Sequence, residues 1–269
     1  MASDRASPTP VGYVAPSTLR SISELAKEIK SSIGGMLGVE PGHRVLDVGC
    51  GPGLDTVGHT RSATLSGYVV GMDRDPQMVT EAETRRRAWD AADRAAYVVA
   101  DGLALPFLND AFDRCRCERV LQHVNDSAHV VAELFRVTRP GGTAVVADSD
   151  WASLSVDCDD RDLERRIMHA VSNCFADGYA GREIARSMRA AGFDIVRIDV
   201  RPLYWTSYER FRMTSFPAAG VVPSLISSGR LAAADWDRFV ELLERSDRHE
   251  SFFASASVIV VAGRKGARQ

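Results

Sequence analysis

Several large classes of protein are excluded by what the sequence lacks. Its 33 basic residues do not outnumber the 36 acidic ones, so the clustered positive charge of a nucleic-acid-binding protein is missing. No apolar run approaches the length of a membrane span, and the first residues lack the charged-then-apolar order of a signal peptide. The five cysteines are odd in number and have no paired-ligand spacing, which favours reduced thiols over disulfides or a metal site. We therefore expect a cytoplasmic protein, monomeric or homodimeric, with neither nucleic acid nor a membrane as partner.

Short β-branched runs alternate with helical stretches over much of the chain. Residues 1–16, rich in Ser, Pro and Ala, predict a disordered tail, and residues 17–37 have the apolar spacing of an amphipathic helix. The alternation that follows requires parallel strands joined by right-handed crossovers. Residues 17–269 therefore predict one Rossmann-like domain, an αβα sandwich around an open, doubly wound, mostly parallel seven-stranded sheet. The expected strands are 43–48, 68–72, 96–100, 112–117, 143–147, 193–200 and 258–263.

Two mostly helical segments interrupt this alternation, at about 152–180 and 204–252. We expect both to be cap insertions above the carboxyl ends of the strands, where open α/β sheets bind ligands. Aromatic side chains gather in these segments; half of them are expected in the core, and the rest suggest an apolar or aromatic substrate. The candidate pocket residues are Trp151, Tyr179, Arg182, Tyr204, Trp205 and Phe216.

The strongest local signal is the segment 45–53, in which glycines occupy every second position after a predicted strand. Such glycines allow a tight turn and a close approach of the backbone to a ligand. Leu54 stands where a dinucleotide fingerprint would have its third glycine, which disfavours a nicotinamide-dependent dehydrogenase. The carboxylate of Asp47 would also repel a pyrophosphate, whereas it suits the ammonium and sulfonium charges of S-adenosylmethionine.

Two further acidic residues follow the next two predicted strands. Asp73 is placed to accept hydrogen bonds from ribose hydroxyls, as an acid does about 20 residues beyond a glycine turn in nucleoside-binding folds. Asp101 can accept a hydrogen bond from an adenine amino group. Each acid alone is equally well explained as a strand-end cap, but three acids at successive strand ends favour a nucleoside site.

Together, the segments 45–53, 71–73, 100–107, 112–113 and 136–142 resemble class I S-adenosylmethionine-dependent methyltransferases of the ubiquinone/menaquinone-biosynthesis type. The resemblance implies S-adenosylmethionine as cofactor, S-adenosylhomocysteine as product and a small molecule as methyl acceptor. It also implies cofactor contacts from a defined set of side chains and backbone groups. These are Asp47, Gly49, Cys50, Gly51, Asp73, Arg74, Met78, Asp101, Gly102, Leu103 and Glu118.

Two of these implied contacts have a simple structural alternative. Met78 would cover the purine, but a methionine in a helix is more often core filling. Glu118 would approach the methionyl ammonium, but Arg119 follows it and could pair with it instead.

Methyl transfer from a sulfonium is an in-line displacement with an electrophile that the cofactor has already activated. A base is optional and is worth about 10² to 10⁴ in rate when the nucleophile must lose a proton. His123 is the candidate base; its alternative role is to cap the next helix beside Asp126. No residue spacing demands a metal. We expect methylation of an O, N or C atom of an apolar or aromatic molecule in secondary metabolism, with a cofactor-binding cyclase or non-catalytic binder as the alternative.

Overall fold

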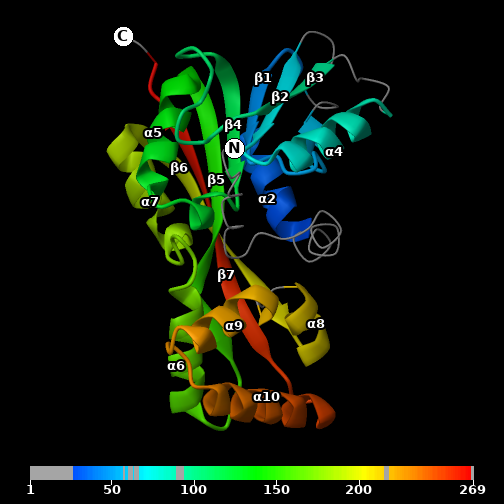
Figure 1. Cartoon of the computed structure of the whole chain (residues 1–269). Helices are drawn as coiled ribbons and strands as arrows, with labels where there is room; N and C mark the ends of the chain where they lie inside the picture. Colours follow the sequence, from blue (N-terminus) through cyan, green and yellow to red (C-terminus); the bar gives the residue numbers. More distant parts are fainter. Residues whose placement is uncertain are drawn as a thin grey trace, which may run out of the picture.

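The computed structural model describes residues 27–56, 58–59, 63, 67–88, 94–214 and 218–267 (Figure 1). The predicted tail, residues 17–26 of the predicted first helix and Phe216 lie outside these residues. Within the part of the chain that is described, no helix is long and apolar enough to cross a membrane.

Seven strands form one sheet in the order β3-β2-β1-β4-β5-β7-β6. The strands β1 to β5 pair in parallel, and β7 runs antiparallel to both β5 and β6. This confirms the predicted mostly parallel, doubly wound sheet, in which the strand order reverses between β1 and β4. The strands are β1 Arg44–Val48, β2 Tyr68–Asp73, β3 Ala95–Val99, β4 Phe112–Glu118, β5 Thr138–Val156, β6 Phe193–Trp205 and β7 Ala254–Lys265.

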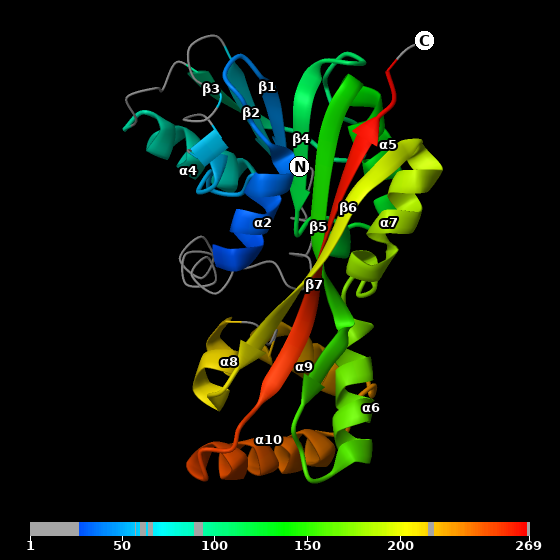
Figure 2. The same ribbon diagram turned by 180° about the vertical axis from the view of Figure 1, so that it is seen from behind.

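Helices cover both faces of the sheet, with α2 and α4 on one side and α5 and α7 on the other (Figures 1 and 2). The helix α2 buries Ile29, Ile33 and Leu37, which recur every four residues and so share one helix face. On the opposite side, α5 and α7 pack against the parallel strands in a second apolar cluster. These layers confirm the αβα sandwich. The helices are α2 Lys27–Leu37, α4 Pro76–Arg86, α5 Ser127–Val137 and α7 Ala180–Ala191.

Three strands are much longer than the sequence predicted. The expected strand 143–147 is part of β5, and the strands expected at 193–200 and 258–263 continue as β6 and β7. Small polar residues dilute the apolar pattern at the added ends, but backbone pairing does not depend on them: Ser155 still pairs with Ser255. The first predicted insertion therefore begins as strand and becomes helical only after Val156.

The long ends of β5, β6 and β7 carry the cap (Figure 2). Val156 and Trp205 both pair with Ala254 at the far end of the sheet, beyond the carboxyl ends of β1 and β4. Four helices pack there around an apolar core that includes Phe211 and Phe239. The helices of the cap come from residues 161–172 and 208–248. They are α6 Arg161–Ser172, α8 Tyr208–Thr214, α9 Ala218–Ser227 and α10 Ala233–Arg248.

Candidate cofactor and active site

The glycine turn closes directly above β1. Gly49, Gly51 and Gly53 all have positive φ, between 52° and 73°, a region that glycine enters without steric cost. The backbone N–H groups of Gly49 and Cys50 donate to the carbonyl of Met72, at 2.8 and 2.9 Å, so the turn is fastened to the neighbouring strand β2. A glycine turn held by backbone hydrogen bonds therefore lies at the point where the strand order reverses.

Asp73 ends β2 beside this turn. Its carboxylate accepts hydrogen bonds from the N–H of Gly51 at 2.9 Å and of Asp75 at 3.0 Å. Burial raises the pKa of this carboxyl, and the two N–H donors oppose the shift. Asp101 follows β3, is exposed and accepts from the N–H of Leu103 at 3.0 Å. Asp47 and Asp73 therefore lie on the neighbouring strands β1 and β2, and Asp101 lies two residues beyond the end of β3, the next strand of the sheet.

A buried arginine occupies the centre of the predicted methionyl end. Arg116 of β4 is 4% exposed and is the register partner of Asp47 on β1. Its Nη1 donates to Asp47 at 2.8 Å, and its Nη2 donates to Asp55 at 2.8 Å and also to Glu118. Three acidic side chains, two of them predicted cofactor contacts, thus converge on one guanidinium.

Two further cations complete this cluster. Lys30 of α2 donates to Asp55 at 2.6 Å. Burial alone would raise the pKa of Asp55, but the positive charges of Arg116 and Lys30 lower it to about 2. Arg119, at φ 55°, lies 3.3 Å from Glu118. The alternative raised for Glu118 is therefore found, since both Arg119 and Arg116 pair with it.

The other predicted cofactor residues differ in their surroundings. Cys50 is buried, and this burial raises the pKa of its thiol, so it is a packing group rather than a nucleophile. Met78 is 3% exposed inside α4, as core filling would require. Gly102 is buried and Leu103 half-buried, whereas Arg74 is exposed.

His123 belongs to a short turn that a buried carboxylate holds in place. Asp148 of β5 accepts from the N–H of Leu121 at 2.8 Å and of Gln122 at 3.3 Å, at the start of the 3-10 turn Leu121–His123. Complete burial raises the pKa of Asp148 to about 7. The next helix is capped by Asp126, which accepts from the N–H of His129, so His123 is not its cap.

The tautomer of His123 follows from its neighbours. The indole N–H of Trp151 donates to the side-chain oxygen of Gln122 at 2.5 Å, which turns the amide nitrogen toward His123 Nε2 at 3.1 Å. Because an indole can only donate, the amide nitrogen must be the donor to His123, and Nε2 must accept. His123 is thereby held as a neutral imidazole with its proton on Nδ1.

The predicted pocket residues divide into distinct environments. Trp151 stacks on Phe175, with ring centroids 4.6 Å apart and an interplanar angle of 7°. Arg182 pairs with the buried Asp150 at 2.8 Å and lies over the ring of Tyr179.

The other two described pocket candidates lie at the end of β6. Trp205 is 3% exposed and its indole N–H donates to Thr214, so it is a core residue of the cap rather than an exposed pocket-lining residue. Tyr204 is 60% exposed on the edge strand β6. Of the candidates in the described residues, only Trp151, Tyr179 and Arg182 lie near the turn that bears His123.

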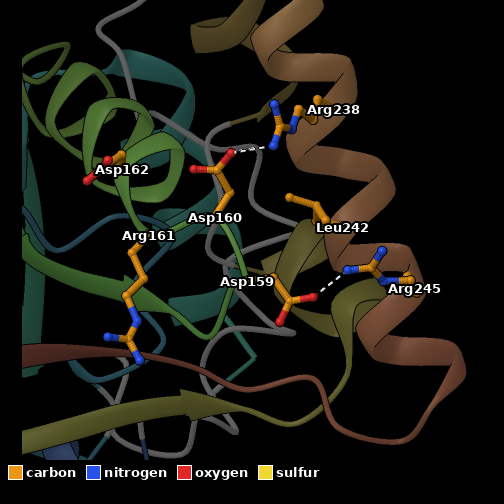
Figure 3. Close-up of a pocket in the computed structure, with 7 residues that line it drawn as sticks. All are labelled: Asp159, Asp160, Arg161, Asp162, Arg238, Leu242 and Arg245. Carbon is orange, nitrogen blue, oxygen red and sulfur yellow. Dashed lines mark hydrogen bonds and ion pairs between the residues drawn. The ribbon is translucent and has the colours of Figure 1, made fainter.

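A separate hollow of about 620 Å³ opens at the outer end of the cap, between the start of α6 and the helix α10 (Figure 3). Arg238 pairs with Asp160 at 2.7 Å, and Arg245 pairs with Asp159. Its charged lining joins two helices and has none of the glycine or acidic strand-end features described above. We therefore assign it a structural role in fastening α10 to the cap.

Comparison with known proteins identifies the class. A family model described as "Methyltransferase domain" matches residues 46–146. An uncharacterized 37.1 kDa protein in transposon Tn4556 of Streptomyces fradiae is 32% identical over 243 residues, 89% of this chain and 67% of that one. Methyltransferase GfsG of Streptomyces halstedii is 33% identical over 64% of this chain and 57% of its own length. The 27-O-demethylrifamycin SV methyltransferase of Amycolatopsis mediterranei is 28% identical over 71% of this chain and 70% of its own length.

Solved structures show the same fold. The [4+2]-cyclase SpnF covers 90% of this chain and 82% of its own, with a TM-score of 0.59 and 21% identity. The geranyl diphosphate C-methyltransferase of Streptomyces coelicolor, solved with S-adenosyl-L-homocysteine, matches over 96% of this chain and 89% of its own, with a TM-score of 0.57 and 17% identity. The chain belongs to the class I S-adenosylmethionine-dependent methyltransferase family.

Arg116 is the central site residue that sequence reasoning missed, together with its cluster partners Asp55 and Lys30. A signal for it exists in β4, whose sequence places charged side chains at 114, 116 and 118, all on one face of the strand. Three alternating charges in a central strand need partners when they are buried. The partners could not be named from the sequence, because Asp47 lies 69 residues away.

Proposed function

We propose that this chain binds S-adenosylmethionine across the carboxyl ends of β1, β2 and β3 and transfers its methyl group to a small molecule held under the cap. The observation that carries the proposal is the placement of the glycine turn 49–53 against Asp73, with Asp47 on the neighbouring strand β1 and Asp101 just after the neighbouring strand β3. Bare backbone suits the close approach of a nucleoside, and carboxylates suit its ribose and adenine donors. The residues present therefore fit this cofactor.

Each residue in this proposal has a distinct task. Asp73 would accept from the ribose hydroxyls, Asp101 would meet the adenine amino group, and Asp47 with Glu118 would face the methionyl ammonium. The cofactor supplies a methyl group that is already activated on a sulfonium. The chain's part is to align the acceptor and exclude water, and alignment of two reactants alone is worth about 7 to 11 kcal/mol.

His123 is the proposed proton acceptor for an acceptor molecule whose nucleophile must lose a proton. Gln122 and Trp151 fix Nε2 as the acceptor nitrogen of its imidazole, so His123 would take up a proton at Nε2 and would give up the hydrogen bond from Gln122 to do so. A carbon nucleophile activated by its own ring, or a free amine, needs no such base.

The substrate that we propose is an apolar or aromatic product of secondary metabolism. The stacked pair Trp151 and Phe175 supplies a flat apolar wall near the turn of His123, and Arg182 with Tyr179 supplies a polar edge. Two relatives, methyltransferase GfsG and the rifamycin methyltransferase, support a small-molecule acceptor.

A cyclase or a non-catalytic binder is the second candidate, because the neighbour SpnF is described as a cyclase and has this fold. The cofactor cleft would be the same in both cases. The difference lies only in whether the methyl group leaves.

Two measurements test the proposal. Calorimetry of the full chain with S-adenosylmethionine, S-adenosylhomocysteine and NADH should give binding of the two sulfur ligands and none of NADH; preferential binding of NADH would refute it. Incubation with S-adenosylmethionine and aromatic candidate acceptors should then release S-adenosylhomocysteine. Binding without release under any acceptor, together with a cyclised product, would establish the second candidate.

A further inference from the structure

The charges around Arg116 balance one another at the methionyl end of the proposed cofactor cleft. Three carboxylates and three cations lie in one connected chain of ion pairs, so their formal charges cancel. The members are Asp47, Asp55, Glu118, Arg116, Lys30 and Arg119. The acids alone would be a strongly attractive site for a cation, but the balanced cluster is not.

Arg116 is the member on which this balance depends. It alone contacts all three acids, it is almost fully buried, and it lies on β4 opposite Asp47 on β1. These two strands border the place where the strand order reverses, which is where doubly wound sheets bind ligands. Lys30 and Arg119 each contact one acid at the rim of the cluster.

The two forms of the cofactor differ in charge. S-adenosylmethionine carries one positive charge more than S-adenosylhomocysteine, because methyl transfer removes the sulfonium. A site with an excess of carboxylates favours the charged form over the neutral product. A balanced site loses that preference, since charges a few ångströms apart interact appreciably even at an effective dielectric constant of about 20.

We propose that Arg116 sets the charge selectivity of the cofactor cleft, so that this chain holds S-adenosylhomocysteine at least as tightly as S-adenosylmethionine. The inference rests on the proposed function, because it assumes that the cofactor lies in this cleft. Arg116 acts here as a positioning and selectivity residue through Asp47 and Glu118, not as a catalytic one.

The test is calorimetry with three ligands: S-adenosylmethionine, sinefungin, whose amine supplies a positive charge without a sulfonium, and S-adenosylhomocysteine. Arg116→Met should improve the affinity for both charged ligands, relative to S-adenosylhomocysteine, by about tenfold or more. Arg116→Lys keeps the charge and should leave the ratio within about twofold of the wild type. A purely structural role would weaken all three ligands together and leave the ratios unchanged.

A second variant, Asp55→Asn, tests the same inference if the Arg116→Met protein does not fold. Removing one negative charge makes the cluster net positive, so the ratio should move in the opposite direction, toward S-adenosylhomocysteine. The double variant Arg116→Met, Asp55→Asn should return to the wild-type ratio. Ratios that stay constant in folded Asp55→Asn protein would overturn the inference. If the wild type binds none of the three ligands, the proposed function itself fails.

Discussion

Gly49 offers a sharp test of the glycine turn, because two separate effects oppose any side chain there. Its φ is 72°, and a Cβ built on its backbone would overlap Cγ2 of Val120. The left-handed conformation costs an alanine about 1 to 2 kcal/mol, and overpacking adds about 1 to 3 kcal/mol. We therefore expect Gly49→Ala to lower the free energy of unfolding by about 2 to 5 kcal/mol, measured by urea denaturation followed by circular dichroism.

Gly141 is a matched control, since its φ is 77° but no atom lies within 4 Å of a Cβ built there. Gly141→Ala should show the conformational cost alone, about 1 to 2 kcal/mol. The steric part of the Gly49 effect should disappear when Val120→Ala is added, because Val120 Cβ is 3.6 Å away and makes an ordinary contact. Equal costs at the two glycines, or no coupling with Val120, would refute the reasoning.

Three further substitutions test other parts of the site. Burial raises the pKa of Asp148 in the folded protein to about 7, so between pH 4 and pH 7 the folded state holds a proton that the unfolded chain has lost. The free energy of unfolding should therefore fall by about 4 kcal/mol as the pH rises from 4 to 7. Unfolding free energies of wild type and Asp148→Asn should therefore differ in slope over this range, and parallel curves would contradict the assignment. Asp73→Ala should weaken cofactor binding by about 1 to 3 kcal/mol in calorimetry, through loss of charge-assisted hydrogen bonds, and an unchanged Kd would remove Asp73 from the site. His123→Asn should lower kcat by about 10²-fold or more and abolish the acid limb of the pH profile for an acceptor that must lose a proton; if kcat is unchanged, His123 has only a structural role.

The sequence was sufficient for the centre of the sheet and insufficient for its long strands. β1 and β2 are apolar runs that end at a glycine or an acid, and these local signals gave their positions within one residue. The outer part of β5 contains Ser149, Asp150 and Ser153, which have low strand propensity. That part is strand because β7 lies beside it, and the identity of the neighbouring strand is a property of the whole fold.

The candidate site divides in the same way. The turn 49–53 and Asp73 were predictable because each depends on residues that are close in sequence or follow a strand directly. The contacts of Arg116 with Asp47 and Asp55, and of Gln122 with Trp151, were not, because they join residues that are far apart in sequence. Asp47 reaches Arg116 across 69 residues of chain, and Trp151 reaches Gln122 across 29, only once the sheet is assembled.

The manner in which the cap is joined to the sheet bears on catalysis. β5 and β7 run without a break from the parallel sheet into the cap, and the irregularity between Asp150 and Ser155 is the point where the register of this pair shifts. Trp151 lies in that irregularity and contacts Gln122, so the wall of the proposed acceptor pocket is attached to the cofactor sheet by strands rather than by flexible loops. An in-line displacement tolerates little misalignment of the reacting atoms, and groups held on regular elements keep their geometry better than groups on loops. The long strands that the sequence did not predict are therefore the part of the fold that would keep acceptor and cofactor in register.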